Sequence, residues 1–250
     1  MTGKIRRMGR LFRGSQSRCL MVPMDHGPFM GPAQGIDRPL EITRQAVAGG
    51  ANALLIGPGF AQAVRHVIGP DMGLALRVSI TAGLAPEATQ ETPVATVDSA
   101  LRLDADAVAV SIFFGRGGET ALLRYLGQLI EASKRYDMPV LAEMMPPNDK
   151  LYDIDAIAHA TRIGWEAGAD IVKTMFSGNV AEFRDMAEGV PVPIIVAGGP
   201  CKSESNGNLL EELRNALDAG AAGVAYGRRV WGSVDPAGLI RQMSNVMFSE

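Results

Sequence analysis

The stretch Ala167-Gly-Ala-Asp-Ile-Val-Lys-Thr174 carries the end of one helical pattern directly into a short, mostly apolar strand. Similar phrases, in which a helix end turns at once into a strand, recur at Gly49-Gly-Ala-Asn52, Asp104-Ala-Asp-Ala107 and Ala219-Gly-Ala-Ala222. Small residues that tolerate the left-handed backbone conformation are typical of helix ends. The repetition therefore indicates a unit of helix and strand that recurs along the chain.

Eight short aliphatic runs predict the strands of a parallel sheet that helices cover on both faces. The predicted strands are residues 19–24, 53–57, 74–79, 107–112, 139–143, 170–174, 193–197 and 223–226. The predicted helices between them are residues 39–48, 94–103, 120–135, 154–167, 180–188 and 209–219. Eight strands in 250 residues predict an α/β fold, a single (β/α)8 TIM barrel over residues 1–250. A doubly wound open sheet is the alternative, but no Gly-x-Gly-x-x-Gly follows a strand.

The composition suits one large domain, with 47% hydrophobic and 20% charged residues. The formal net charge is −3 and the basic residues are scattered, which argues against nucleic acid or an anionic membrane as a partner. One basic concentration, Lys4 to Arg10 and on to Arg13, lies within residues 1–15, and we expect a solvated N-terminal segment there. No apolar run approaches the roughly 20 residues that span a bilayer.

The potential metal ligands are dispersed along the chain. Cys19 and Cys201 have no metal-binding or redox spacing, so we expect reduced thiols in a cytoplasmic protein. His26, His66 and His159 are isolated from one another, and no cluster of His, Cys and carboxylates suggests zinc. We therefore expect neither a metal nor a cofactor.

Lys173 is the residue that most directly suggests chemistry, because it is a single ammonium in a run that otherwise reads as a buried strand. A buried lysine is costly unless it is paired or deprotonated. The neutral amine is the form that attacks a carbonyl to make a Schiff base. The alternative is a lysine at a strand end that reaches solvent.

Other polar residues stand at predicted strand ends, where the active sites of barrels lie. The first strand ends in Asp25-His26-Gly27, which is also compatible with a turn in which Asp25 caps local amides. The seventh ends in Gly198-Gly199 and the eighth in Gly227-Arg228, the positions where barrels commonly bind phosphate. Arg228 can add a charge-assisted contact. Together with Lys173, these residues predict Schiff-base chemistry on a phosphorylated ketone or aldehyde.

Six segments together resemble one known family. They are Val22-Pro-Met-Asp-His-Gly27, Gly31-Pro-Ala-Gln-Gly35, Gly50-Ala-Asn-Ala53, Ala169-Asp-Ile-Val-Lys-Thr174, Ala197-Gly-Gly-Pro200 and Ala221-Ala-Gly-Val-Ala-Tyr-Gly-Arg228. The chain is similar to the archaeal-type class I fructose-bisphosphate aldolases and their relatives, the aminodideoxyheptulosonate synthases. The similarity runs from about Arg10 to Trp231 and is nearest to the synthase branch.

This resemblance implies a TIM barrel without a metal that assembles as a homo-oligomer, a decamer. It implies that Lys173 is the Schiff-base lysine and that Asp25 is an acid/base carboxylate. It implies that Gly27, Pro28 and Phe29 line the substrate pocket and that Gly198, Gly199, Gly227 and Arg228 bind the phosphate. Met145 and Thr174 are further predicted substrate-binding residues.

One departure from the family concerns proton transfer. The family usually has a tyrosine at the end of strand five, where this chain has Met145, and a thioether transfers no proton. Strand alternation places Glu143 on the same side as Met145, and in the barrel interior Glu143 is a carboxylate near Lys173. Glu143 is thus a candidate acid/base, or else only an ion-pair partner of Lys173 or Arg77. His26 and Tyr152 are the other candidates.

Three functions remain open at this stage. The leading one is a class I aldolase or transaldolase-like synthase that acts on a phosphorylated ketose. The resemblance suggests a dihydroxyacetone-phosphate-type or ketohexose-phosphate donor, with aspartate semialdehyde as acceptor. A second is thiolase-type acyl transfer on a phosphorylated dicarbonyl, and a third is a barrel that binds sugar phosphates without catalysis.

Overall fold

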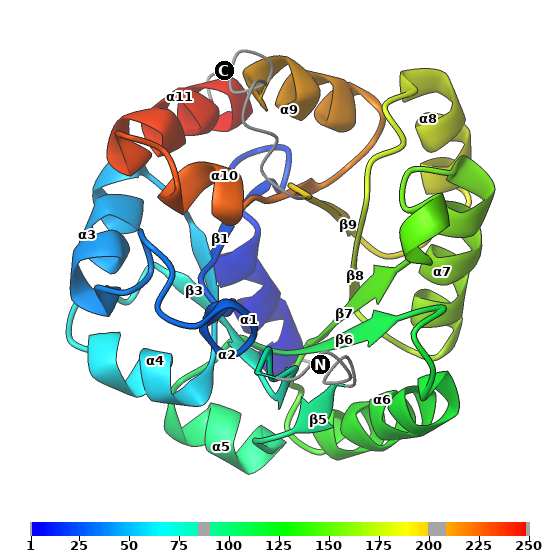
Figure 1. Ribbon diagram of the computed structural model, residues 1–250, viewed down its shortest axis with the longest axis horizontal. Coiled ribbons are helices and arrows are strands. Elements are labelled where there is room, and N and C mark those ends of the chain that lie inside the picture. Colours follow the sequence, from blue (N-terminus) through cyan, green and yellow to red (C-terminus); the bar gives the residue numbers. More distant parts are fainter. Residues whose placement is uncertain (1, 85–90, 200–208, 249–250) are drawn as a thin grey trace.

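Eight parallel strands close into a barrel, and helices surround it (Figure 1). The computed structural model describes residues 2–84, 91–199 and 209–248. Around the barrel the strands follow the order β1-β10-β9-β8-β7-β6-β3-β2. The predicted (β/α)8 TIM barrel is therefore confirmed, and the alternative of an open doubly wound sheet is wrong.

The barrel strands lie close to the predicted runs. They are β1 (Cys19–Pro23), β2 (Ala53–Ile56), β3 (Gly73–Arg77), β6 (Ala107–Phe113), β7 (Val140–Met145), β8 (Ile171–Thr174), β9 (Ile194–Ala197) and β10 (Gly223–Ala225). The helices are α1 (Thr2–Leu11), α2 (Gly27–Met30), α3 (Pro39–Gly49), α4 (Pro58–Val64), α5 (Val97–Arg102), α6 (Glu119–Lys134), α7 (Ile154–Glu166), α8 (Val180–Glu188), α9 (Leu209–Asp218), α10 (Arg228–Trp231) and α11 (Pro236–Phe248), with a 3-10 turn η1 (Asn148–Lys150).

The strand register determines which side chains meet inside the barrel. In the parallel ladders, Ser111 on β6 is paired with Glu143 on β7, and Glu143 is paired with Lys173 on β8. Residues two positions earlier on these strands, including Ala109, Leu141 and Ile171, belong to an apolar cluster inside the barrel. Because alternate residues share one face of a strand, the polar layer lies directly above this apolar floor, at the carboxyl ends of the strands.

A small antiparallel hairpin was not anticipated by the strand predictions. It pairs β4 (Ser79–Ile80) with β5 (Thr92–Pro93) beyond the end of β3. The predicted helix at 94–103 starts later, at Val97, because the Thr96 side chain accepts a hydrogen bond from the Ser99 amide and caps it. Two-residue strands carry too little periodicity for a sequence pattern to reveal them.

The expectation of a solvated N-terminal segment is wrong. Helix α1 lies near the centre of the view down the barrel (Figure 1), and Leu11 at its end is fully buried in the apolar cluster inside the barrel. The Asn52 side chain donates a 3.1 Å hydrogen bond to the Leu11 carbonyl, and Lys4 forms a 2.7 Å ion pair with Asp170. Arg10 also pairs with the buried Asp106. Lys4 and Arg10 are therefore partners of carboxylates next to strands, and α1 covers the amino-terminal end of the barrel.

Two further expectations concern the cysteines and the membrane. Cys19 is a fully buried free thiol inside the barrel, and burial raises its pKa, so it stays protonated. Cys201 and Pro200 lie outside the described residues. None of the helices in the described ranges combines the length and apolarity that crossing a membrane requires.

The burial of α1 predicts a stability effect. Replacing Leu11 with Ala should lower the free energy of unfolding by about 2–5 kcal/mol, because it leaves a cavity in the barrel floor. The matched control is Ile5→Ala on the same helix, where the side chain is 70% exposed and the expected change is within about 0.5 kcal/mol. Urea denaturation measures both. Equal effects would mean that α1 does not seal the barrel.

Candidate active site

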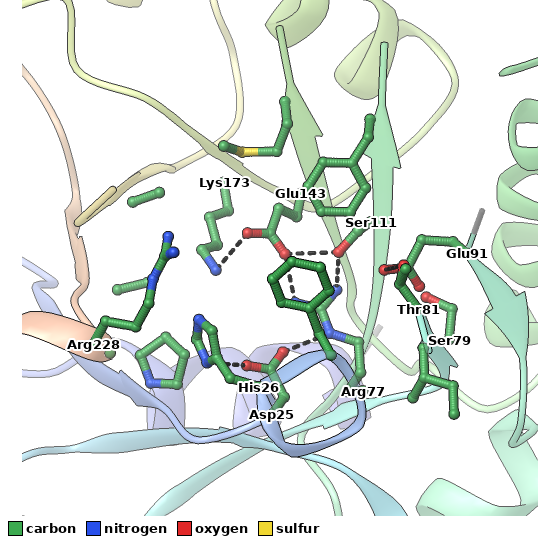
Figure 2. Close-up of a pocket in the computed structure, with 18 of the residues that line it drawn as sticks. Asp25, His26, Arg77, Ser79, Thr81, Glu91, Ser111, Glu143, Lys173 and Arg228 are labelled. Carbon is green, nitrogen blue, oxygen red and sulfur yellow. Dashed lines mark hydrogen bonds and ion pairs between the residues drawn. The ribbon is translucent and has the colours of Figure 1, made fainter. Parts of the chain in front are cut away.

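A cavity of about 260 Å³ opens at the carboxyl ends of the barrel strands. Figure 2 shows side chains from opposite sides of the barrel converging on it. Lys173 from β8 and Glu143 from β7 face Asp25 and His26, which follow β1, while Arg77 reaches in from the end of β3. The cavity therefore gathers the polar strand-end residues that are far apart in the sequence.

Four buried charges form an alternating chain across the floor of the cavity. Lys173 Nζ lies 2.7 Å from Glu143 Oε1, and Glu143 Oε2 lies 2.5 Å from Arg77 Nη2. Arg77 Nε donates a 2.7 Å hydrogen bond to Asp25 Oδ2. Ser111 Oγ donates to Glu143 Oε2 at 2.7 Å and accepts from Arg77 Nη1 at 2.6 Å. Asp25 and Glu143 each therefore contact a cation, which offsets the cost of burying them.

The neighbouring charges determine the protonation state of the Glu143 and Asp25 side chains. Burial alone raises the pKa of Glu143, but Lys173 and Arg77 together lower it well below its ordinary value. Burial also opposes ionisation of Asp25, but the permanent cation Arg77 and the nearby Lys173 lower its pKa below the ordinary value. Both groups are therefore carboxylates at neutral pH, and Glu143 is a weak proton acceptor.

His26 is the cavity residue with a neutral, titratable ring. Its Nδ1 lies 3.3 Å from Asp25 Oδ1 without a hydrogen bond of good geometry. Burial lowers the pKa of His26, and Lys173 and Arg228 lower it further, while Asp25 partly offsets this effect. The ring packs edge-on against Trp231, whose Nε1 donates a 3.1 Å hydrogen bond to the Pro23 carbonyl. The imidazole is therefore held in place and uncharged at pH 7.

The glycines after β9 and β10 line one end of the cavity together with Arg228. Gly199 has φ +66°, and a Cβ there would lie 2.9 Å from the Tyr152 hydroxyl. A Cβ on Gly227 would lie 2.7 Å from the Pro23 carbonyl oxygen. Arg228 forms no ion pair with any carboxylate among the described residues. This end therefore combines glycine backbone without side chains, close packing and a guanidinium without an ion-pair partner among the described residues, which suits a phosphate.

Some predicted binding residues lie elsewhere. Thr174 is buried on the other face of β8, where its hydroxyl donates to the Met144 carbonyl at 3.0 Å. Thr174 does not line the cavity, because it follows Lys173 directly and successive side chains of a strand point to opposite faces. Gly27 and Pro28 begin α2 and do not line the cavity, whereas Phe29 and Met145 do. Tyr152 lies beside Gly199, outside the cavity lining.

A profile of the DeoC/LacD family of aldolases matches residues 19–233 of this sequence. The chain belongs to the DeoC/LacD aldolase family. It is similar to 2-amino-3,7-dideoxy-D-threo-hept-6-ulosonate synthase of Halobacterium salinarum, with 32% identity over 99% of this chain and 92% of the relative. A synthase of 2-amino-4,5-dihydroxy-6-oxo-7-(phosphonooxy)heptanoate from Streptomyces griseus is 31% identical over 96% and 89% of the two chains. The 3-hydroxy-5-phosphonooxypentane-2,4-dione thiolase of Salmonella paratyphi A is 32% identical over 96% and 81%.

Solved structures support the same assignment. An archaeal fructose 1,6-bisphosphate aldolase superposes with a TM-score of 0.87 at 25% identity, over 99% of this chain and 100% of the other. A second such structure has its catalytic lysine covalently bound to the carbinolamine intermediate of the substrate, with a TM-score of 0.86, 25% identity and coverage of 98% and 99%. The chain is therefore an enzyme of the class I aldolase type, and a purely binding role is not supported.

Sequence reasoning missed part of the cavity of this aldolase. Ser79, Thr81, Glu91 and Arg116 also line it, from the β4–β5 hairpin and the loop after β6. These residues stand in irregular segments without a motif, so no pattern marked them. Ser111 was detectable, because it stands at an inward position two residues beyond Ala109. Among the described residues, no group of three or more His, Cys, Asp or Glu side chains is arranged to hold a metal ion.

The ion-pair chain of the aldolase predicts how stability depends on pH. Since the folded state lowers the pKa of Asp25 and Glu143, the stabilisation is present above their ordinary values near 4 and is lost as the pH falls through the lower folded values. Urea midpoints should therefore decrease from pH 6 to pH 3. Glu143→Gln should lose about 3–5 kcal/mol at pH 7 and show a shallower pH slope.

The control for this prediction is Glu131→Gln on α6. Glu131 pairs with Lys134 at 2.5 Å, but its side chain is 72% exposed. Its replacement should change stability by less than about 1 kcal/mol and leave the pH slope unchanged. A Glu143→Gln protein with the full wild-type slope would show that Glu143 does not drive the acid response.

Proposed function

We propose that this aldolase joins a phosphorylated ketone to an aldehyde through an imine on Lys173. The observation that carries the proposal is the position of Lys173: it is buried, inward-facing on β8, and open to a cavity whose neighbouring strands β9 and β10 end in glycine loops. An imine with the donor ketone acts as an electron sink, so the adjacent carbon can form or break a C–C bond as an enamine.

The glycine loops and Arg228 support the placement of the donor phosphate. A phosphate bound here can accept hydrogen bonds from the backbone amides of Gly199 and Gly227, and Arg228 adds a charge-assisted contact. In Figure 2, Arg228 and Lys173 lie on the same side of the cavity. A short phosphorylated ketone, such as dihydroxyacetone phosphate, is therefore held with its carbonyl towards the amine.

His26 and Asp25 are the proton-transfer groups in this proposal. Imine formation requires the neutral amine of Lys173. His26 lies close enough to Lys173 that the lysine charge lowers the pKa of the His26 imidazole. A neutral imidazole accepts a proton near pH 7, and the adjacent Asp25 carboxylate stabilises the imidazolium that results. Glu143 instead stabilises the positive charge on the nitrogen, since its carboxylate contacts Nζ and is a weak base.

We base the proposed acceptor aldehyde on the synthases of similar sequence. The product named for the Streptomyces griseus relative carries an amino group at carbon 2 of a heptanoate and a phosphate at carbon 7. An aldol addition of a phosphorylated donor to aspartate semialdehyde gives a product with the amino group at one end and the phosphate at the other. We therefore propose that reaction for this chain, within the biosynthesis of aromatic amino acids. A homo-oligomer, a decamer by resemblance, and a cytoplasmic location remain predictions.

Thiolase-type acyl transfer is the second candidate, favoured by the 32% identity to the dione thiolase. That reaction requires a thiol acceptor such as coenzyme A and releases an acyl thioester. Detection of an acyl thioester from a phosphorylated dicarbonyl would select it over the aldol reaction.

Imine trapping tests the proposal directly. Incubation with dihydroxyacetone phosphate or fructose 1,6-bisphosphate, followed by borohydride reduction, should leave a covalent adduct on Lys173 that peptide mass spectrometry locates. Lys173→Met should give no adduct and no turnover while its circular dichroism spectrum stays that of the wild type. An adduct on another lysine, or carbon–carbon activity retained in Lys173→Met, would contradict this assignment.

Met145 offers a second test, because it lines the cavity two residues beyond Glu143 on the same face of β7. A tyrosine there would bring a phenol to the reacting carbons, and general acid/base groups typically contribute about 10²–10⁴-fold to rate. Met145→Tyr should raise the rate of fructose 1,6-bisphosphate cleavage at least about tenfold. Met145→Phe, which has the same ring without the hydroxyl, should not. Equal rates in the two variants would remove proton transfer as the explanation.

A further inference from the structure

The cavity has a second polar end that the donor chemistry leaves unused. It is formed by Ser79 and Thr81 around the β4–β5 hairpin, by Glu91 just before β5, and by Arg116 in the loop after β6. Figure 2 shows Glu91, Thr81 and Ser79 on the side of the Lys173–Glu143 pair opposite to Arg228. A linear molecule that begins at Arg228 and passes Lys173 therefore ends at this hairpin.

Among the described residues, no cation forms an ion pair with the Glu91 carboxylate, although the charges of Arg77 and Arg116 interact with it from a greater distance. Its Oε1 accepts a 3.1 Å hydrogen bond from the Thr81 hydroxyl. Its Oε2 is buried and has no hydrogen-bond partner of good geometry in the described parts of the chain. Burial raises the pKa of Glu91, and the charge of Arg77 only partly offsets this effect. An ammonium group on a ligand would supply the missing positive charge.

Arg116 stands at the same end with most of its donors available. Its guanidinium lies 4.3 Å above the centre of the Phe113 ring, and Nη2 donates a 3.0 Å hydrogen bond to Asn148 Oδ1. It forms no ion pair with a carboxylate in the ranges that the structure describes. A guanidinium has five N–H donors, so a planar pair remains for a ligand carboxylate.

We infer that Glu91 and Arg116 select the acceptor, with Glu91 receiving its ammonium group and Arg116 its carboxylate. The inference rests on the proposed function, since it needs the donor at Lys173. The combination recognises an aldehyde of the amino-acid type. It disfavours a phosphorylated aldehyde, because a phosphate dianion would lie beside the Glu91 carboxylate. Glu91 and Arg116 thus favour the substrate of a synthase over the sugar bisphosphate of a cleaving aldolase.

The test compares two acceptors that differ only in the amino group. With dihydroxyacetone phosphate as donor, the wild type should use aspartate semialdehyde with a kcat/KM at least about tenfold above that for succinate semialdehyde. In Glu91→Gln this preference should fall to near one. The ratio is measured within one protein sample, so a loss of folded or active protein does not change it.

Further variants separate the two charges. Arg116→Gln should lower kcat/KM for both semialdehydes by a similar factor, because both carry the carboxylate. Glu131→Gln, on the exposed face of α6, should preserve the wild-type ratio. In Glu91→Gln the use of glyceraldehyde 3-phosphate relative to aspartate semialdehyde should rise, since the repelling charge is gone.

A binding measurement makes the inference independent of turnover. Homoserine and 4-hydroxybutyrate mimic the two acceptors but carry an alcohol that does not react with lysine. Calorimetry should show that the wild type binds homoserine more tightly and that Glu91→Gln loses the preference. Equal affinities in the wild type, or equal use of the two semialdehydes by a protein that traps the donor imine, would overturn the inference. A preference for homoserine without any imine adduct would overturn the proposed function alone.

Discussion

The contact between Lys173 and Glu143 is the interaction on which the rest of the site depends. The two side chains are paired on adjacent strands and meet at 2.7 Å in the barrel interior. Burying either charge alone is costly, and removing one partner of such a pair leaves the other uncompensated. Arg77 and Asp25 extend the same arrangement. The amine that reacts is therefore held by the groups that also make its burial tolerable.

The barrel supplies this arrangement through register and layering. Parallel pairing puts Ser111, Glu143 and Lys173 at one level, above a floor of small and aliphatic side chains. Helix α1 covers the opposite end with Leu11, so an apolar layer lies beneath the charges. A lower dielectric around the cavity strengthens each electrostatic contact made within it. The same fold leaves the loops after the strands free to vary. The proposed donor and acceptor ends of the cavity are formed by different loops of this kind.

The two ends of the cavity divide the recognition of a linear molecule. Glycine backbone and Arg228 stand at one end, and Glu91 with Arg116 at the other, while Lys173 lies between them. The donor end resembles what many barrels present after their last two strands. The acceptor end is built from a two-residue hairpin and a loop, which are segments whose sequence is little constrained by the sheet. In the proposed reaction, specificity would therefore be set mainly by loops beyond the ends of the barrel strands.

The eight strands, the barrel, and the positions of Lys173 and Asp25 at strand ends could all be predicted from the sequence. Hydrophobic periodicity is a local property, and a parallel barrel brings the carboxyl ends of its strands together in one site. Alternation also placed Glu143 and Met145 on one face of β7. That α1 packs under the barrel with Leu11 buried, and that Glu91 lines the cavity, became visible only in the folded chain. Both depend on contacts between segments distant in the chain, which no local pattern encodes.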